Sequence, residues 1–211
     1  MIKAVFTDRD GTLNPDPDGY IDCPERFSLY PGTENSVKCL NENNYAFFVI
    51  TNQSGIARGY FGFEELEKVH DKFIRMLREK SAFADEIMVS PYHKDGVIEP
   101  WNRDHEDRKP GTGLFRKISG KYKIDRKKSF MIGDKFSDIL FGKKCGLQTV
   151  LVRTGSGDKT FQSLKKSDIK PDFVCKDFNE AVLLIEKLEK QDDKIKSCLK
   201  KKCRKQLIRK K

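Results

Sequence analysis

Short apolar runs alternate along this chain with longer amphipathic stretches. Residues 46–50 are continuously apolar, which is typical of an inner strand that is covered on both faces of a sheet. Residues 63–80 instead place apolar side chains at helical spacing, namely Leu66, Val69, Phe73 and Leu77. The pattern therefore predicts strands and helices in alternation.

The predicted strands are Ala4–Thr7, Tyr45–Thr51, Glu86–Ser90, Phe130–Ile132, Thr149–Val152 and Phe173–Val174. The predicted helices lie near Thr33–Glu42, Phe63–Lys80, Thr112–Tyr122, Phe136–Cys145 and Asn179–Glu189. This alternation predicts an α/β fold, a Rossmann-like parallel sheet flanked by helices on both faces. Ligands of such sheets bind beyond the carboxyl ends of the strands, so the polar residues there are the candidates for chemistry.

The first motif consists of two aspartates, Asp8 and Asp10, which follow the first strand and precede Gly11 and Thr12. Residues at a spacing of two point to the same side of a strand, so both carboxylates can converge where the strand ends. One carboxylate could attack a phosphorus atom while the other handles the proton of the leaving group. Their combined charge favours a divalent cation with oxygen ligands, above all Mg²⁺. An ordinary turn is the alternative, because Asp and Gly both suit turns.

Two further motifs suit a phosphate ligand. Residues 51–55, Thr-Asn-Gln-Ser-Gly, follow the second strand, and their hydroxyl and backbone N–H groups could bind phosphate oxygens. Before the third helix, Lys109 supplies a positive charge, and Arg108 could add fork-like contacts to phosphate or sugar oxygens. A polar turn and a solvated basic pair are the respective alternatives.

The fourth motif follows the strand at residues 130–132 and contains Asp134 and Asp138. Asp134 is a candidate metal ligand, whereas Asp138 could instead cap or support the loop. Each of the three later motifs is weak by itself. Together, the four motifs bring a nucleophile, an acid/base group, a hydroxyl, a lysine and a metal-binding carboxylate to one rim of the sheet, as phosphoryl transfer requires.

The 211 residues suit one domain, at residues 1–189, with an appendage at residues 190–211. No run approaches the roughly 18 apolar residues of a membrane span. The N-terminal residues lead directly into a strand without the pattern of a signal peptide, so a cytoplasmic location is expected. The six cysteines are scattered, so free thiols are expected. The protein is also expected to be a monomer.

The net charge of +10 comes from the C-terminal tail, because residues 194–211 hold ten positive charges and no acid. The remaining residues are neutral overall, which argues against a nucleic-acid-binding body. One interpretation of the tail is a basic helix that touches an acidic membrane surface, nucleic acid or a protein partner. A solvated or disordered extension is favoured, because the tail has few apolar residues to bury.

The four motifs resemble the haloacid dehalogenase (HAD) superfamily of phosphatases, and the resemblance runs from residue 1 to about residue 188. It is carried by Asp8–Thr12, Thr51–Gly59, Arg108–Pro110, Gly133–Lys135 and Val152–Gly155. Histidinol-phosphate phosphatases share the first and third motifs, whereas residues 54–59 look more like the heptose bisphosphate phosphatases of the superfamily. The 36 residues between Asn14 and Thr51 suit one helix and one strand, so no large cap domain is expected.

The resemblance implies a role for each motif. Asp8 would be the nucleophile that carries an aspartyl-phosphate, and Asp10 would be the general acid and base. Mg²⁺ would lie between Asp8, the main-chain carbonyl of Asp10, and Asp134. Thr51 and Lys109 would hold the phosphoryl oxygens. The expected contacts to a small sugar phosphate are Arg9, Asp16, Gly19, Tyr20, Asn52, Gln53, Ser54, Arg108 and Lys135.

One departure concerns the long loop before the third helix. The resembled families commonly hold a structural zinc ion there through three cysteines and a histidine. This chain has none of the three cysteines, and Tyr92 stands in place of the histidine. His93, His105 and Asp107 could still form a site, although the soft thiolate ligands are lost. A metal-free loop held by packing of Tyr92 and Trp101 is the favoured interpretation.

The leading functional hypothesis is an Mg²⁺-dependent sugar-phosphate phosphatase. It would remove the 7-phosphate from a heptose 1,7-bisphosphate and keep the anomeric phosphate. A phosphatase of histidinol phosphate or of another small phosphate ester is the second hypothesis. A non-catalytic protein that binds through its basic tail ranks last, because every charged group that the chemistry needs is present.

Overall fold

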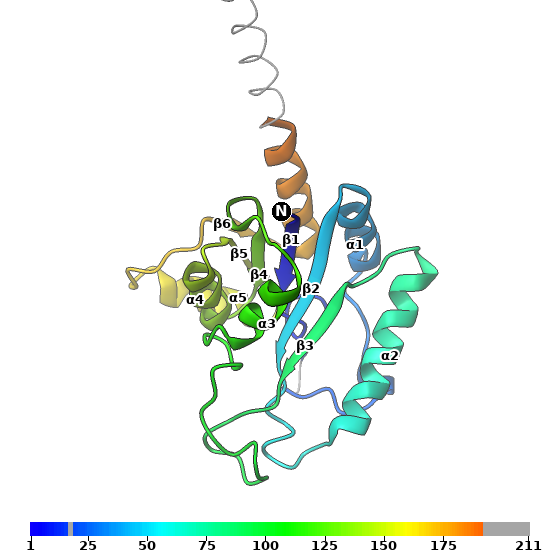
Figure 1. Cartoon of the computed structure of the whole chain (residues 1–211), viewed down its shortest axis with the longest axis vertical. Helices are drawn as coiled ribbons and strands as arrows, with labels where there is room; N and C mark the ends of the chain where they lie inside the picture. The colour runs from blue at the N-terminus through cyan, green and yellow to red at the C-terminus, as the bar shows by residue number, and fades with distance from the viewer. Residues whose placement is uncertain (17–18, 192–211) are drawn as a thin grey trace, which may run out of the picture.

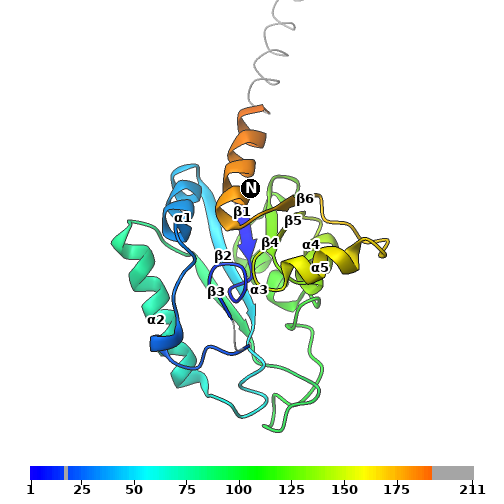
Figure 2. The same cartoon turned by 180° about the vertical axis from the view of Figure 1, so that it is seen from behind.

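Six parallel strands form one sheet in the computed structural model, which describes residues 1–16 and 19–191 (Figures 1 and 2). The strand order is β3-β2-β1-β4-β5-β6, so β1 lies in the middle, beside β2 and β4. The strands are β1 (Lys3–Thr7), β2 (Tyr45–Asn52), β3 (Glu86–Ser90), β4 (Phe130–Gly133), β5 (Gln148–Val152) and β6 (Phe173–Cys175).

The helices are α1 (Thr33–Glu42), α2 (Phe63–Glu79), α3 (Gly113–Lys121), α4 (Phe136–Cys145) and α5 (Gly157–Leu164). A last helix starts at residue 178 and is described as far as residue 191. Two short 3₁₀ helices are η1 (Pro24–Arg26) and η2 (Arg126–Lys128). The α/β fold with a parallel sheet flanked by helices is therefore confirmed.

The two sides of the central strands carry separate apolar layers. On β1, Val5 packs in the layer of α1, α2 and the last helix, whereas Ala4 and Phe6 pack in the layer of α3 and α4. On β2, Phe47 and Phe48 divide between the layers in the same way. All five side chains are completely buried, and burial of a large apolar side chain contributes about 1.5–3 kcal/mol. The continuous apolar run in β2 thus reflects a strand that is covered on both faces.

All of the predicted strands and helices are present, with small shifts of their ends. Helix α2 buries its predicted stripe of Leu66, Val69, Phe73 and Leu77. Helix α5 was not predicted, because it is short and Leu164 and the half-buried Phe161 are its only large apolar side chains. The segment from Asn14 to Thr51 contains η1, α1 and most of β2, apart from residues 17 and 18, which lie outside the described part. In its described residues this segment contains no cap domain.

The long loop at residues 91–112 lies beyond the carboxyl ends of the strands, whereas the last helix runs past their amino ends (Figure 1). Among residues 1–16 and 19–191, no helix combines the length and the apolar character that a membrane span needs. The four cysteines in this part of the chain are free thiols, as predicted. The basic tail beyond residue 191 lies outside the described residues, so both interpretations of it stay predictions.

Candidate active site

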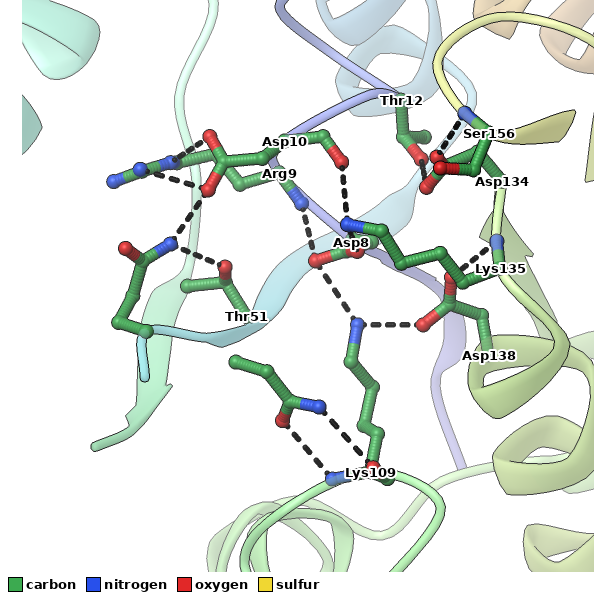
Figure 3. Close-up of polar contacts among 12 residues, drawn as sticks. Asp8, Arg9, Asp10, Thr12, Thr51, Lys109, Asp134, Lys135, Asp138 and Ser156 are labelled. Carbon is green, nitrogen blue, oxygen red and sulfur yellow. Dashed lines mark hydrogen bonds and ion pairs between the residues drawn. The ribbon is translucent and has the colours of Figure 1, made fainter. Parts of the chain in front are cut away.

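Segments that are far apart in the sequence meet at the carboxyl end of the sheet and form a buried charged cluster (Figure 3). Asp8 follows β1, Lys109 precedes α3, Asp134 follows β4, and Asp138 lies in the first turn of α4. The Lys109 ammonium lies 3.0 Å from Asp8 Oδ1 and 2.7 Å from Asp138 Oδ1. The fold therefore brings together the first, third and fourth motifs of the sequence.

Asp8 is held by the adjacent backbone and by two lysines. The N–H of Arg9 donates to Asp8 Oδ1 at 2.8 Å, on the oxygen that also pairs with Lys109. Lys135 Nζ lies 3.8 Å from Asp8 Oδ2 and donates to the carbonyl oxygen of Asp10 at 3.4 Å. Asp8 is only 3% exposed, yet it lines a cavity, so a ligand in that cavity can reach its carboxylate.

The side chain of Asn52 fixes Lys109 from the end of β2. Asn52 Nδ2 donates to the Lys109 carbonyl at 3.1 Å, and the Lys109 N–H donates to Asn52 Oδ1 at 3.0 Å. Burial by itself would lower the pKa of Lys109, but its ion pairs with Asp138 and Asp8 outweigh burial and raise that pKa. Lys109 is therefore a permanent positive charge in the cluster.

Asp138 supports the loop, which is one of the two roles considered for it. Its Oδ2 accepts a hydrogen bond of 2.9 Å from the N–H of Lys135, in the manner of a residue that closes the first turn of a helix. Its Oδ1 pairs with Lys109. Both oxygens of Asp138 are thus already engaged by the chain.

Asp134 is completely buried and is held from two sides. The N–H of Ser156 donates to Asp134 Oδ2 at 2.7 Å, and the Thr12 hydroxyl donates to Oδ1 at 3.3 Å. Burial raises the pKa of Asp134 to about 7; the negative charges of Asp138 and Asp8 add to the rise, and Lys135 opposes it. Asp134 is thus a carboxylate that lacks a full positive partner.

The acidic cluster suits a divalent cation. Carboxylate oxygens of Asp8, Asp134 and Asp138 lie within 4.8 Å of one another. In the described part of the chain, no other three acidic, His or Cys side chains lie this close together. Three buried carboxylates face two lysines, Lys109 and Lys135, so the cluster is short of positive charge. Oxygen ligands of this kind are those that Mg²⁺ prefers. The donor set therefore fits the ion that the sequence predicted.

The Asp10 carboxylate receives four hydrogen bonds. Arg9 donates through Nε to Oδ1 at 2.8 Å and through Nη2 to Oδ2 at 2.9 Å. Asn14 Nδ2 donates to Oδ1 at 3.0 Å, and Gln53 Nε2 donates to Oδ2 at 2.7 Å. Burial would raise the pKa of Asp10, but Arg9 and the two amides outweigh it and lower that pKa. Asp10 therefore stands as a carboxylate in this arrangement.

The sequence predicts a substrate contact for Arg9, whereas the structure places this residue outside the lining of the cavity. Its side chain is completely buried and lies between Asp10 and His70, away from the cavity. Successive residues of an extended segment point to opposite sides, so Arg9 cannot share the direction of its neighbours.

The Thr51 hydroxyl is also buried, and it accepts a hydrogen bond of 2.8 Å from Gln53 Nε2. Its contact with a phosphoryl group stays a prediction.

A cavity of about 360 Å³ opens beside Asp8 and Asp10. The predicted substrate residues that line it are Asp16, Gly19, Tyr20, Asn52, Gln53, Ser54, Arg108 and Lys135. An adjoining cavity of about 430 Å³ shares Asp10, Asp16 and Lys135 with the first and adds Asp134. The lining thus combines cationic side chains, which can bind phosphate oxygens, with neutral polar side chains that can form hydrogen bonds.

Aromatic packing holds the loop at residues 91–112. The rings of Tyr92 and His105 stack with their centroids 3.7 Å apart. Trp101 packs edge-on against Tyr92 at 5.1 Å and against Phe63 of α2 at 5.5 Å. The predicted contact between Tyr92 and Trp101 is confirmed.

The three candidate zinc ligands of this loop have other partners. His93 Nε2 lies 3.1 Å from Arg58 Nη2, and Asp107 Oδ2 lies 2.6 Å from Lys117 Nζ. His105 stacks on an aromatic ring. Within the described residues, these three groups do not come together as a metal-binding set. The side chains present therefore do not fit a structural zinc ion.

Three residues of the site escaped the sequence analysis. Asn14 could have been found, because it closes the tight turn of the first motif, in which the Gly11 N–H donates to the Asn14 carbonyl at 2.8 Å. Ser156 acts through its backbone N–H, which carries no signal in the sequence. His70 reaches the site from α2, a contact that only the packing of that helix creates.

Known proteins resemble this chain over most of its length. The D-glycero-beta-D-manno-heptose-1,7-bisphosphate 7-phosphatase of Haemophilus ducreyi is 37% identical over 169 residues, which cover 79% of this chain and 91% of the relative. The D-glycero-alpha-D-manno-heptose-1,7-bisphosphate 7-phosphatase of Photorhabdus laumondii is 35% identical over 155 residues, 73% of this chain and 84% of the relative. The crystal structure of the D,D-heptose 1,7-bisphosphate phosphatase from B. bronchiseptica, complexed with magnesium and phosphate, matches with a TM-score of 0.77 and 28% identity, over 90% of this chain and 99% of that one.

A family model of HAD-hydrolase-like proteins matches residues 107–181. Together with the relatives that are named phosphatases and with the parallel sheet, this match defines the class: an enzyme of the HAD superfamily that hydrolyses phosphate esters. The sequence identity and coverage of its relatives also define the family within this class. The chain belongs to the D-glycero-D-manno-heptose-1,7-bisphosphate 7-phosphatase family. The resemblance to heptose bisphosphate phosphatases is therefore confirmed.

Proposed function

We propose that this protein hydrolyses the 7-phosphate ester of D-glycero-D-manno-heptose 1,7-bisphosphate and releases heptose 1-phosphate and inorganic phosphate. The names of its relatives support this substrate. The observation that carries the proposal is the 3.0 Å pairing of Asp8 with buried Lys109, beside a cavity that also exposes Arg108 and Lys135. A carboxylate and several cations around one cavity suit phosphoryl transfer from an anionic ester.

In the proposed reaction, Asp8 attacks the phosphorus atom, and the bond between phosphorus and the sugar oxygen breaks. Asp10 must first take up a proton, against the hydrogen bonds that favour its carboxylate form, and it donates this proton to that oxygen as it leaves. Asp10 then takes a proton from the water that attacks the aspartyl-phosphate, and phosphate departs with both aspartates restored. Lys109 offsets negative charge on the phosphoryl group throughout.

Asp8, the main-chain carbonyl of Asp10, and Asp134 would hold Mg²⁺. When bound, the ion supplies the positive charge that the acidic cluster lacks and offsets the charge of the transferring group. Asp138 is assigned a supporting role, because its oxygens already bind Lys109 and the backbone of Lys135.

The proposed contacts to the sugar and its phosphates come from the residues that line the cavity. Arg108 and Lys135 supply positive charge, and Asp16 and Tyr20 supply hydrogen-bonding groups. Asn52 and Gln53 also hold Lys109 and Asp10 in place, so their replacement would disturb catalysis as well as binding. Thr51 is proposed to bind a phosphoryl oxygen through its hydroxyl.

The test compares kcat/KM for the alpha and beta anomers of the heptose bisphosphate with that for histidinol phosphate. We expect a clear preference for one bisphosphate anomer, and ³¹P NMR should show that the anomeric phosphate remains on the sugar. Equal or higher kcat/KM on histidinol phosphate would reject the proposed substrate.

The mechanism is tested with Asp8→Asn, which keeps the shape of the side chain and removes the nucleophile. We expect no turnover of any phosphate ester, whereas Asp71→Asn, an exposed change on α2, should retain full activity. Turnover by the Asp8 variant would refute the aspartyl-phosphate route.

We also propose a cytoplasmic monomer whose body does not bind nucleic acid, as the composition of residues 1–193 suggests. Light scattering of the purified full chain tests the oligomeric state. A mass of twice 24.4 kDa or more would reject the monomer.

A further inference from the structure

A chain of three side chains, of which Arg9 and Asp10 are buried and His70 is partly buried, leads from α2 to Asp10. Arg9 Nε and Nη2 form two parallel hydrogen bonds with the two oxygens of Asp10, at 2.8 and 2.9 Å. The remaining terminal nitrogen of Arg9, Nη1, lies 3.0 Å from Nε2 of His70. The Arg9 side chain is completely buried, so no solvent competes for these contacts.

The chemistry of the chain fixes the protonation of His70. A guanidinium group can only donate hydrogen bonds, so His70 Nε2 must be the acceptor and its proton must lie on Nδ1. Burial, and then the adjacent Arg9 charge, lower the pKa of His70 to about 3. His70 is therefore neutral at physiological pH and offers Arg9 a fixed acceptor.

This acceptor has a geometric consequence for Asp10. A bidentate pair holds a guanidinium and a carboxylate in one plane, so the group that orients the guanidinium also orients the carboxylate. His70 anchors the far end of that plane, from a helix that packs on the sheet through Val69 and Phe73. Asn14 and Gln53 then bind the Asp10 oxygens from other directions.

We propose that His70 and Arg9 are positioning residues, which set the orientation of the Asp10 carboxylate from which it exchanges a proton with the leaving group. The inference rests on the proposed function, because it takes Asp10 as the general acid. Neither residue touches the substrate: His70 acts through Arg9, and Arg9 acts through Asp10.

A proton from Asp10 matters only when the leaving group is poor. An alkoxide such as that of a sugar must be protonated as it leaves, whereas a nitrophenolate can leave without a proton. Loss of correct orientation should therefore reduce kcat/KM on an alkyl phosphate and spare kcat/KM on p-nitrophenyl phosphate. A general loosening of the fold would reduce both, so the ratio of the two values isolates the positioning role.

The experiment replaces His70 in the full chain. His70→Leu removes the acceptor, whereas His70→Gln keeps an oxygen that can accept from Arg9. For His70→Leu we expect about a tenfold loss of kcat/KM on the heptose bisphosphate and less than about a twofold loss on p-nitrophenyl phosphate, since general acid catalysis typically contributes 10²–10⁴-fold. His70→Gln should recover most of the ratio. Glu67→Gln, an exposed change one turn earlier on α2, is the matched control and should change neither value.

A double-mutant cycle with Asp10→Asn adds a second readout. In that background the acid is already absent, so His70→Leu should leave the ratio of the two kcat/KM values unchanged. If His70→Leu does not fold, Arg9→Lys takes its place, because lysine keeps the charge but cannot form the planar pair.

An equal loss on both substrates would overturn the proposal, and so would a normal ratio in His70→Leu or a further change in the Asp10→Asn background. The ratio can be measured on any alkyl phosphate that the enzyme hydrolyses. Failure of the proposed heptose substrate, seen in the wild-type preference, is thus distinct from failure of this inference.

Discussion

At the scale of single residues, Gly11 combines two constraints that no other amino acid satisfies. Its φ is +85°, in the left-handed region. A Cβ atom at this position would lie 2.4 Å from Asp134 Oδ2, where no atom can stand. Gly11 thus lets the turn of the first motif pass directly over the proposed metal ligand.

Gly11→Ala should destabilise the protein and displace Asp134. We expect a loss of about 1–3 kcal/mol in the free energy of unfolding, from backbone strain and steric conflict together. The rise in Tm on addition of Mg²⁺ should also shrink. Gly120→Ala is the matched control, because Gly120 is exposed in α3 and its added Cβ would meet no atom within 4 Å. Equal thermal unfolding curves for the two variants would contradict this account of Gly11.

His70 should make the stability of the protein depend on pH. Its pKa falls from 6.5 when unfolded to about 3 when folded, so the unfolded state binds the proton first as pH drops. The contribution is complete above pH 6.5 and is lost progressively as pH falls from there toward 3. Between pH 7.5 and pH 5.0 the wild type should lose about 2 kcal/mol more than His70→Gln. Urea unfolding of both proteins at the two pH values measures this difference, and parallel losses would count against it.

The sequence predicted Asp8, Lys109 and Asp134 correctly as neighbours, because the carboxyl ends of parallel strands meet at one edge. The supporting contacts were not predictable in the same way. Arg9 lies one residue from each aspartate, where alternation sends it to the other side, and its partner His70 comes from a distant helix. Asn52 was expected to bind substrate, but its amide also clamps the backbone of Lys109. Such pairings depend on the packed fold.

At the scale of elements, aromatic side chains hold the loop at residues 91–112 in place. Trp101 joins the Tyr92–His105 stack to Phe63 of α2, so it ties the loop to the body. The same loop leads to Arg108, whose Nη1 donates to the Tyr92 carbonyl at 3.0 Å. The packing of Tyr92 therefore helps to fix the position of the Arg108 side chain, which lines the cavity.

Trp101→Ala should weaken substrate binding more than it slows the chemistry. Two aromatic contacts are lost, each of which contributes about 0.5–1.5 kcal/mol, so stability should fall by about 1–3 kcal/mol. KM for the heptose bisphosphate should rise several-fold while kcat changes little, because Asp8 lies outside this loop and Lys109 is held separately by the side chain of Asn52. Phe83→Ala removes an aromatic ring that is 54% exposed and is the control. A loss confined to kcat would show that the loop acts in another way.

Most elements could be predicted because their patterns are long or continuous. The run in β2 and the stripe on α2 are examples, and both are buried as expected. Helix α5 has only eight residues and a largely polar sequence, so its order comes from packing of Leu164 and Phe161 against neighbouring elements. Propensity in such a short segment is too weak to specify a helix.

At the scale of the whole molecule, the sheet order explains why charge accumulates at one point. Strand β1 lies between β2 and β4, so the carboxyl ends of these three parallel strands lie side by side at one edge of the sheet. The fold thereby buries three carboxylates beside two lysines, an arrangement that favours metal binding at a cost to stability.

Asp134→Asn should separate stability from function. Removal of one negative charge relieves the repulsion in the acidic cluster, and the amide oxygen can still accept from the Ser156 N–H. In EDTA we expect the variant to be more stable than the wild type by about 0.5–2 kcal/mol. In Mg²⁺ it should show little gain in Tm and almost no phosphatase activity. Thermal unfolding with and without Mg²⁺ tests both parts, and a less stable variant in EDTA would speak against crowded charge as the cause.

The last helix runs past the amino ends of the strands (Figures 1 and 2). Its Glu189 pairs with Lys3 at the start of β1. The cavity beside Asp8 and Asp10 lies at the opposite end of the sheet, beyond the carboxyl ends of the strands. Material grafted after this helix, such as a tether to a solid support, would be joined at the pole away from the entry route of the substrate.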